Sequence, residues 1–104
     1  MSPVCECIRD VMRKTYPGIQ FRVRAQRPRS KQAGRNVIML QVPADRAEMT
    51  RDVAKTLTKY TEGITIAIKG GQAETPREAE PKIYYPACGK YIFAELDEII
   101  VSTY

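Results

Sequence analysis

The 104-residue chain contains no histidine and no tryptophan. Histidine is the side chain that most often acts as a general acid or base, and it is the commonest metal ligand. The sequence has no recognisable nucleophile motif, and Gly70-Gly71 is not followed by the Gly-Lys-Ser/Thr of a phosphate-binding loop. These absences predict a protein that is not an enzyme and that carries no cofactor.

Cysteine is scarce as well. The three cysteines are an odd number and lack the spacing of a disulfide framework. On a helix, Cys5 and Cys7 point to nearly opposite sides, so regular geometry does not let both bind one metal ion. Together with Cys88 they are expected to be reduced, partly buried thiols, without a metal site.

Long apolar runs are missing. No run approaches the roughly 18 residues that a membrane-spanning helix requires, and Glu6, Arg9 and Asp10 interrupt the N-terminal region where a secretory signal would have its apolar core. We therefore expect a cytoplasmic protein without a membrane partner. The length suits a single domain over residues 1–104 with one modest core.

The sequence does contain clear periodicity in its first half. An apolar stripe predicts an amphipathic helix that begins at Ser2-Pro3 and ends at Tyr16-Pro17-Gly18. Its members are Val4, Ile8, Val11 and Met12. From Ile19 the period changes to two, which predicts a strand over residues 19–26 with one apolar face and one basic face. Residues 36–42 are nearly continuously apolar and predict an interior strand, paired antiparallel with the first.

A second helix is predicted from Asp45 to about Tyr60. Asp45 and Glu48 resemble a capping box, and Glu62-Gly63 is a typical helix end. The residues expected to face the sheet are Thr50, Val53, Ala54, Leu57 and Tyr60. Residues 64–69 alternate again and predict a third strand, whereas residues 70–81 lack periodicity and predict a mobile loop.

The last quarter of the chain predicts short strands at residues 82–85, 91–96 and 99–104, with a helix over residues 94–101 as the competing interpretation. The whole order predicts an α+β fold, in which two helices pack on one face of a mainly antiparallel sheet of four to five strands. Gln20, Arg22 and Arg24 would then emerge on the other face. That face is open to a partner if the outward residues of the neighbouring strand are also polar.

Positive charge is concentrated early in the chain. Residues 1–42 carry nine Lys/Arg against two acids, a balance of +7, whereas residues 43–104 carry eight against ten, a balance of −2. The candidate binding residues are Gln20, Arg22, Arg24, Arg27, Arg29, Lys31 and Arg35. Strand arginines spaced by two lie about 7 Å apart on one face, close to the spacing of phosphates along a nucleic-acid strand. Guanidinium groups also bind phosphate or carboxylate with two hydrogen bonds.

Three interpretations of this basic cluster stay open: a solvated face and loop, a nucleic-acid site, and a site for an acidic protein surface or ribonucleoprotein. The aromatic residues of the last quarter are Tyr84, Tyr85, Tyr91, Phe93 and Tyr104. They could stack on bases only if some of them share a face with Arg22 and Arg24. Otherwise they serve core and sheet-edge packing.

The segment Ile8-Arg-Asp-Val-Met-Arg-Lys-Thr-Tyr-Pro-Gly-Ile-Gln-Phe-Arg-Val-Arg24 resembles the opening of a large-polyvalent-protein-associated domain. Members of that family have a helix, an aromatic-Pro-Gly turn, a Phe-x-Val-Arg strand, a polar loop, a second strand and a helix that ends near an aromatic residue. The resemblance reaches about Tyr60 and implies a protein of phage, plasmid or integrative elements, in a family of poorly defined activity. Members usually have a Gly/Ser-rich loop where this chain has basic residues 27–35, so a role tied to that loop does not carry over.

We therefore expect a small mobile-element accessory protein that binds nucleic acid, or a nucleic-acid-handling complex, through its basic strand face and loop. The alternative is a protein–protein inhibitor of a host defence system such as CRISPR, with no direct binding to nucleic acid. A dimerising module that uses an edge strand near the C-terminus is a third possibility.

Overall fold

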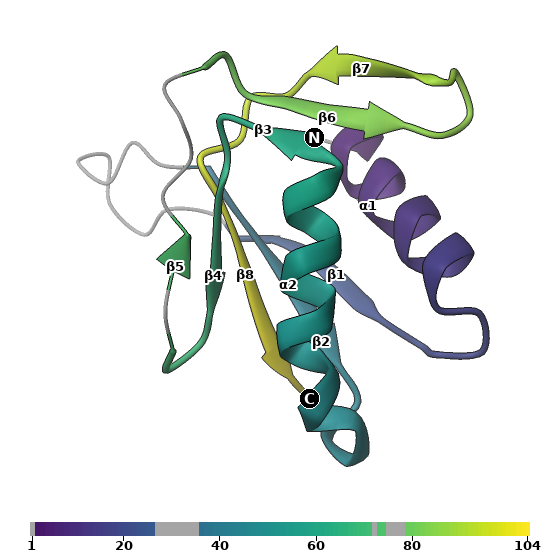
Figure 1. The fold of residues 1–104 in the computed structure, drawn as a ribbon, viewed down its shortest axis with the longest axis vertical. Coiled ribbons are helices and arrows are strands. Elements are labelled where there is room, and N and C mark those ends of the chain that lie inside the picture. The colour runs from purple at the N-terminus through teal and green to yellow at the C-terminus, as the bar shows by residue number, and fades with distance from the viewer. Residues whose placement is uncertain (1, 27–35, 72, 75–78) are drawn as a thin grey trace.

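The computed structural model describes residues 2–26, 36–71, 73–74 and 79–104. Along the chain the elements are α1 (Ser2–Thr15), β1 (Arg22–Gln26), β2 (Val37–Val42), the 3-10 helix η1 (Ala44–Met49), α2 (Thr50–Lys59), β3 (Thr61–Glu62), β4 (Thr65–Ile68), β5 (Ala73–Glu74), β6 (Lys82–Tyr85), β7 (Lys90–Phe93) and β8 (Glu98–Thr103) (Figure 1).

The larger sheet has five strands in the order β1-β2-β8-β4-β5. The last strand of the chain, β8, lies in its centre and runs parallel to both β2 and β4. The outer strands β1 and β5 pair antiparallel with β2 and β4. A strand with neighbours on both sides is buried more completely than an edge strand, which fits the continuous apolar run Ile99-Ile100-Val101 in β8.

A smaller sheet covers one end of the helical layer (Figure 1). It has the strand order β3-β6-β7, and all of its pairs are antiparallel. The link between β6 and β7 is a tight turn in which Gly89 has φ +69° and its N–H donates to the carbonyl of Tyr85 at 2.8 Å. This sheet therefore places two hairpin strands above α1 and the C-terminal end of α2.

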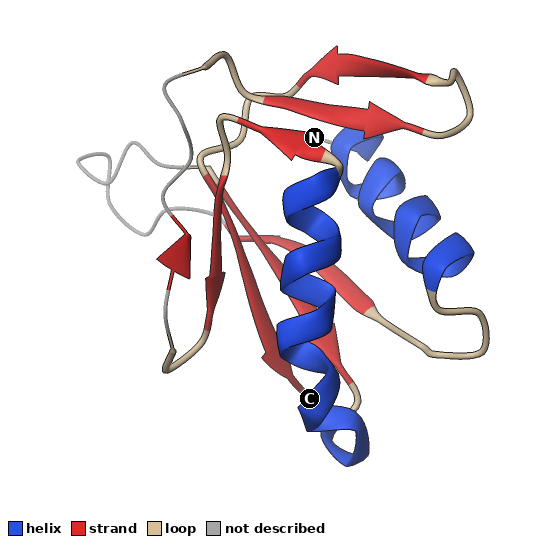
Figure 2. Cartoon of the chain, in the orientation of Figure 1, coloured by secondary structure: helices blue, strands red, loops and turns tan. Residues whose placement is uncertain are grey.

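The predicted α+β class is confirmed, and both α-helices lie on one face of the larger sheet (Figure 2). Antiparallel pairing predominates over the two sheets, with four antiparallel pairs against two parallel ones. The predicted antiparallel pair of the first two strands is present as β1 and β2. The sequence did not predict the second sheet or the parallel insertion of β8.

One continuous core lies between the helices and the larger sheet. It is built from the alternating inward residues of the central strands and the apolar stripes of the helices: Ile8, Met12, Ile38, Leu40, Val42, Val53, Leu57, Ile99 and Val101 are all at most 1% exposed. Cys5 and Cys7 are both buried, and Cys88 is exposed. All three cysteines are free thiols.

The second helix differs from its prediction at its N-terminus. Residues Ala44–Met49 form a 3-10 helix, in which Arg46 departs from helical geometry (φ −121°, ψ 30°). Pro43 occupies the N-cap position and no side chain caps it, so the predicted capping box of Asp45 and Glu48 is wrong. The 3-10 helix already begins at Ala44, so Asp45 lies inside its first turn and is not its N-cap residue. The α-helix proper starts at Thr50, and its buried residues Val53 and Leu57 are among those predicted to face the sheet.

Two predictions for the second half also need correction. The helix proposed as the competing interpretation over residues 94–101 is absent. Residues 94–97 connect β7 to β8, and residues 98–101 belong to β8. The predicted loop over residues 70–81 contains β5, whose Ala73 and Glu74 pair with Ala67 and Ile66. Residues 72 and 75–78 of that predicted loop lie outside the described residues.

Candidate functional site

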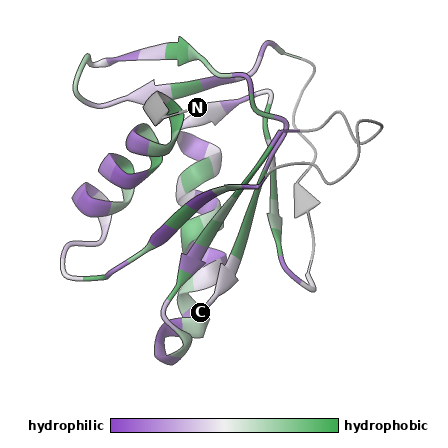
Figure 3. Cartoon of the chain, turned by 180° about the vertical axis from the view of Figure 1, so that it is seen from behind, coloured by the Kyte–Doolittle hydropathy of each residue, from purple (hydrophilic) through white to green (hydrophobic). Residues whose placement is uncertain are grey.

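We define the open face as the side of the larger sheet opposite α1 and α2. Of the described helices, none covers it, and Figure 3 looks onto it with α2 behind the strands and α1 beside them. Strand alternation assigns the side chains, because the buried apolar residues of each strand face the helices and their neighbours in the strand face away. The open face then comprises Arg22, Arg24, Gln26, Val37, Met39, Gln41, Thr65, Ala67, Glu98, Ile100 and Ser102.

Strand register arranges these side chains in three rows across the sheet. The first row is polar throughout: Arg22 pairs with Gln41, and Gln41 pairs with Ser102. Lys69 extends this row, because it follows Ile68, which pairs with Val101, and its N–H donates to the Val101 carbonyl at 2.9 Å. This row, called the polar row below, carries positive charge at both ends.

The second row is apolar after its first residue. Arg24 pairs with Met39, Met39 with Ile100, and Ile100 with Ala67. Met39, Ile100 and Ala67 are half-buried. The outward residues of β2, which neighbours β1, are therefore not all polar, and the condition for a wholly polar face is not met. The open face combines a polar row with an apolar strip beside it.

Arg22 is held in place by the end of the chain. Its Cζ lies 4.1 Å from the centroid of the Tyr104 ring, which is a cation–π arrangement. The Tyr104 hydroxyl donates a 2.6 Å hydrogen bond to the carbonyl of Gln20. Backbone bonds anchor this tyrosine further, because its N–H donates to the Val42 carbonyl at 2.9 Å. The exposed guanidinium is thus stacked on a ring that is itself fixed at two points.

The structure places three of the predicted site residues, and their role in binding stays a prediction. Gln20, Arg22 and Arg24 are exposed, and the two arginines share the open face. The loop residues Arg27, Arg29, Lys31 and Arg35 lie outside the described residues. Sequence reasoning did not assign Gln41 or Lys69 to the site. The register of β1 with β2 places Gln41 beside Arg22, and the pairing of β4 with β8 places Lys69 in the same row. Tyr104 was among the aromatic residues considered for stacking, and its ring contacts Arg22.

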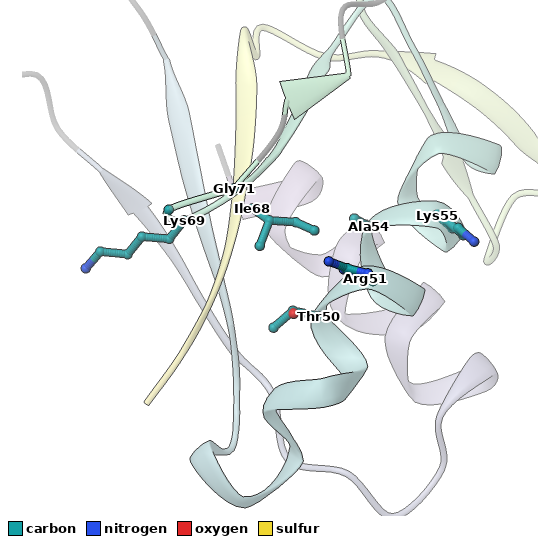
Figure 4. A pocket seen from close by; sticks show the side chains of 8 residues that line it. Thr50, Arg51, Ala54, Lys55, Ile68, Lys69 and Gly71 are labelled. Carbon is teal, nitrogen blue, oxygen red and sulfur yellow. The ribbon is translucent and has the colours of Figure 1, made fainter.

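Lys69 also borders a groove of about 600 Å³ between α2 and the turn after β4. Figure 4 shows that Ile68 points toward α2, whereas the Lys69 side chain points away from the helix. Arg51 and Lys55 contribute the positive charge of the helical wall. The ammonium group of Lys69 therefore lies on the side of the sheet that carries the polar row. Arg51 and Lys55 are the two cations on the helical wall of the groove.

Ser102 stands out within the polar row. Its side chain is 7% exposed, and its Oγ is buried without a hydrogen-bond partner among the described residues. A buried hydroxyl without a partner lowers stability by about 1–3 kcal/mol relative to a paired one. The centre of the polar row thus contains an unsatisfied polar atom between Gln41 and Lys69.

The remaining aromatic residues of the last quarter lie on the smaller sheet. The Tyr60 and Tyr84 rings are 5.7 Å apart and the Tyr84 and Tyr91 rings 5.5 Å apart, so three tyrosines form a row across its strands. Phe93 is the most exposed large apolar side chain of the described residues, at 60%. Of the aromatic residues considered, Tyr104 is the one whose ring contacts an arginine of the open face.

Two other classes of site find no support in the described part of the chain. It contains no group of three His, Cys, Asp or Glu side chains that could hold a metal ion. None of its helices has the length and apolar character needed to cross a membrane.

No protein-family model matches the chain, no curated protein matches it, and no solved structure matches it. The resemblance of its first part to the large-polyvalent-protein-associated domain therefore stays a prediction. Function has to be inferred from the arrangement of the described residues.

Proposed function

We propose that this chain is a small binding protein that holds single-stranded nucleic acid on the open face of its larger sheet. The observation that supports it most directly is the pair of exposed arginines on one face of β1, one of them stacked on Tyr104. The charge imbalance of the first 42 residues and the resemblance to a mobile-element family support a role as an accessory protein of phage or plasmid elements.

The polar row has the chemistry of a phosphate-binding track. Arg22 and Lys69 stand on strands three positions apart in the sheet, which corresponds to roughly 14 Å. Between them Gln41 offers an amide that can donate a hydrogen bond to a phosphate oxygen. Backbone contacts of this kind depend on charge and bind any sequence.

The apolar strip beside the polar row suits the bases of the same strand. Unpaired bases bind proteins by stacking and apolar contact, and an arginine guanidinium also offers a flat surface for stacking. Arg24 stands at the head of this strip, next to Met39. A strand whose phosphates follow the polar row can therefore place its bases over Met39 and Ile100.

The same strip favours the second candidate function, an inhibitor that binds a protein of a host defence system such as CRISPR. Protein interfaces commonly have an apolar centre and a polar rim in which arginine is enriched. Val37, Met39 and Ile100 would form that centre, with Arg22 and Arg24 at its rim. This function requires no nucleic-acid affinity in the free protein.

The two functions are separated by fluorescence anisotropy with labelled single- and double-stranded DNA and RNA at two salt concentrations. The test variant is Arg22→Gln, Arg24→Gln, Lys69→Gln, and the control variant Lys14→Gln, Arg46→Gln, Lys59→Gln removes three exposed charges elsewhere. We expect salt-sensitive binding of single strands, with a log–log slope of about −1.4 for the two phosphates that Arg22 and Lys69 neutralise. The test variant should lose binding roughly tenfold or more, and the control should keep it within about threefold.

Absence of binding at low salt would overturn the nucleic-acid function, as would equal losses in the two variants. A protein partner that the test variant fails to bind, with little dependence on salt, would then identify the open face as a protein interface.

A further inference from the structure

Strand β7 forms a free edge of the smaller sheet. Among the described residues it pairs with β6 alone, and it lies at the outer margin of the molecule (Figure 1). Free strand edges present backbone donors and acceptors to other chains, and proteins usually shield them with charges, proline or a covering element. The two side chains Tyr91 and Phe93 that flank the middle of β7 are instead aromatic and 42% and 60% exposed.

The backbone groups on this free edge can be assigned from the hydrogen bonds nearby. The N–H of Ala94 donates to the Pro81 carbonyl at 2.9 Å, so Ala94 points its backbone groups toward the β6 side. The N–H of Tyr84 donates to the Tyr60 carbonyl at 2.8 Å, so the Tyr84–Tyr91 pair is not joined by hydrogen bonds. Because these orientations alternate along a strand, the outward groups belong to Tyr91 and Phe93.

We propose that a second copy of this chain pairs with β7 in antiparallel fashion, with Ile92 of the two copies on the two-fold axis. In this register Tyr91 faces the second copy's Phe93, and Phe93 faces its Tyr91. Each of these pairs joins residues whose backbone groups point outward, so it forms two hydrogen bonds. The result is a six-stranded sheet with the order β3-β6-β7-β7-β6-β3, an isologous arrangement.

Side-chain chemistry favours a second copy over another partner. Within each copy Tyr60, Tyr84 and Tyr91 already form an aromatic row. The register adds Phe93 of the second copy at the end of this row, so the row of each copy gains one ring. Cross-strand aromatic pairs of this type stabilise sheets. Tyr91 and Phe93 of each copy therefore both face an aromatic residue in β7 of the other copy.

Charge at the start of β7 favours the antiparallel direction over an in-register parallel one. Lys90 begins the strand and is exposed. In the antiparallel register Lys90 lies opposite Ala94 of the second copy. In-register parallel pairing would instead place the two Lys90 side chains beside each other, which is unfavourable. The segment is thus self-complementary in its hydrogen bonding and in its aromatic pairs.

The test is the mass of the complete chain in solution, measured by size-exclusion chromatography with light scattering at increasing concentration up to roughly 100 μM, far above a micromolar Kd. We expect a concentration-dependent dimer. Phe93→Glu should weaken it at least roughly tenfold by placing a charge opposite Tyr91. The control Ala87→Glu adds the same charge to an exposed residue of the β6–β7 turn and should leave the dimer intact.

The double variant Tyr91→Lys, Phe93→Glu tests the register itself. With Tyr91 opposite Phe93 of the second copy, it places lysine opposite glutamate and should restore dimerisation relative to Phe93→Glu alone. Circular dichroism of every variant checks that the fold is retained. A register that pairs Phe93 with itself would place glutamate opposite glutamate, and no restoration would follow.

A monomer at every concentration overturns the proposal, and so does equal weakening by Phe93→Glu and Ala87→Glu. If the monomeric protein binds single-stranded nucleic acid and Phe93→Glu abolishes that binding, the aromatic row serves base stacking instead. These outcomes are independent of the open face, because none of the substituted residues belongs to it.

Discussion

The guanidinium of Arg22 lies over the ring of Tyr104, with Cζ 4.1 Å from the ring centroid, although 81 residues separate the two positions in the chain. This contact joins the edge strand β1 to the residue that follows the central strand β8. It limits the freedom of the long arginine side chain before any ligand arrives. An ordered side chain loses less conformational entropy on binding than a mobile one.

The first prediction separates the ring of Tyr104 from its hydroxyl. Tyr104→Phe removes the hydrogen bond to the Gln20 carbonyl and should lower stability by about 1 kcal/mol. Tyr104→Leu also removes the cation–π contact and should cost roughly 0.5–1 kcal/mol more. Nucleic-acid affinity should fall with Tyr104→Leu and stay nearly constant with Tyr104→Phe. Urea unfolding and anisotropy measure both quantities, and equal affinities for the two variants would speak against orientation of Arg22 by the ring.

The second prediction concerns the link between the two helices. The Tyr16 hydroxyl donates to Asp52 Oδ2 at 2.5 Å and lies 2.8 Å from Thr56 Oγ1. Tyr16→Phe removes a hydrogen bond to a carboxylate and should lower the free energy of unfolding by roughly 1.5–3 kcal/mol. The matched control is Tyr91→Phe, whose hydroxyl makes a longer, exposed bond to the Lys59 carbonyl at 3.1 Å. Its loss should be smaller, and a control effect as large as that of Tyr16→Phe would contradict the assignment.

The third prediction is a loss of stability in alkali. Burial, with help from the nearby Asp10 charge, raises the pKa of the Cys7 thiol from 9.0 to about 11. Burial and the hydrogen bond to Asp52 also raise the pKa of Tyr16. Both groups are thus held neutral in the folded state. Their contribution is fully present below the unfolded pKa values and is lost as the pH rises through the folded ones.

The unfolding temperature should therefore decline between pH 9 and pH 11, as Cys7 begins to ionise in the unfolded chain. Cys7→Ala should make this decline shallower, whereas Cys88→Ala, which removes an exposed thiol that contributes less to the raised Cys7 pKa than burial and Asp10 do, should change its slope less. Thermal melts across that pH range provide the comparison. If Cys7→Ala and the unmodified protein show the same slope, groups other than Cys7 cause the decline.

The fourth prediction compares two glycines with positive φ. A Cβ on Gly63 (φ +68°) would clash with the Ala79 carbonyl oxygen, whereas one on Gly18 (φ +89°) would have no atom within 4 Å. Gly18→Ala should cost about 1–2 kcal/mol for the left-handed backbone alone. Gly63→Ala should cost a further 1–3 kcal/mol, roughly, for overpacking against the backbone of residues 79–80. Urea midpoints of the two variants test the difference, and equal values would show that the backbone at 79–80 yields easily.

Local periodicity was sufficient to predict most elements of this fold. The stripe of Val4, Ile8, Val11 and Met12 gave α1, and the change to a period of two gave β1 and its antiparallel partner. These signals lie within a few turns or one strand of sequence, where burial imposes a pattern directly. The 3-10 helix was missed because Asp45 and Glu48 resemble a capping box, whereas the helical turn already begins at Ala44.

Pairing over long distances could not be predicted in the same way. Nothing local in Glu98–Thr103 indicates that this strand lies between Val37–Val42 and Thr65–Ile68, although its continuous apolar run is typical of a central strand. The site residues also divide into those that local periodicity predicts and those that depend on long-range strand pairing. Arg22 and Arg24 were predicted from alternation within one strand. The place of Gln41 required the register of β1 with β2, and the place of Lys69 required the pairing of β4 with β8.

The central position of β8 has a consequence for how the chain folds. Strands β2 and β4 do not pair with each other, so the larger sheet stays in two halves, each with an exposed edge, until residues 98–103 insert between them. Contacts between strands this distant in sequence form slowly, because a long loop must close before they are gained. During that interval the two halves are open to association with other chains, so dilution or a chaperone during refolding should raise the yield of native protein.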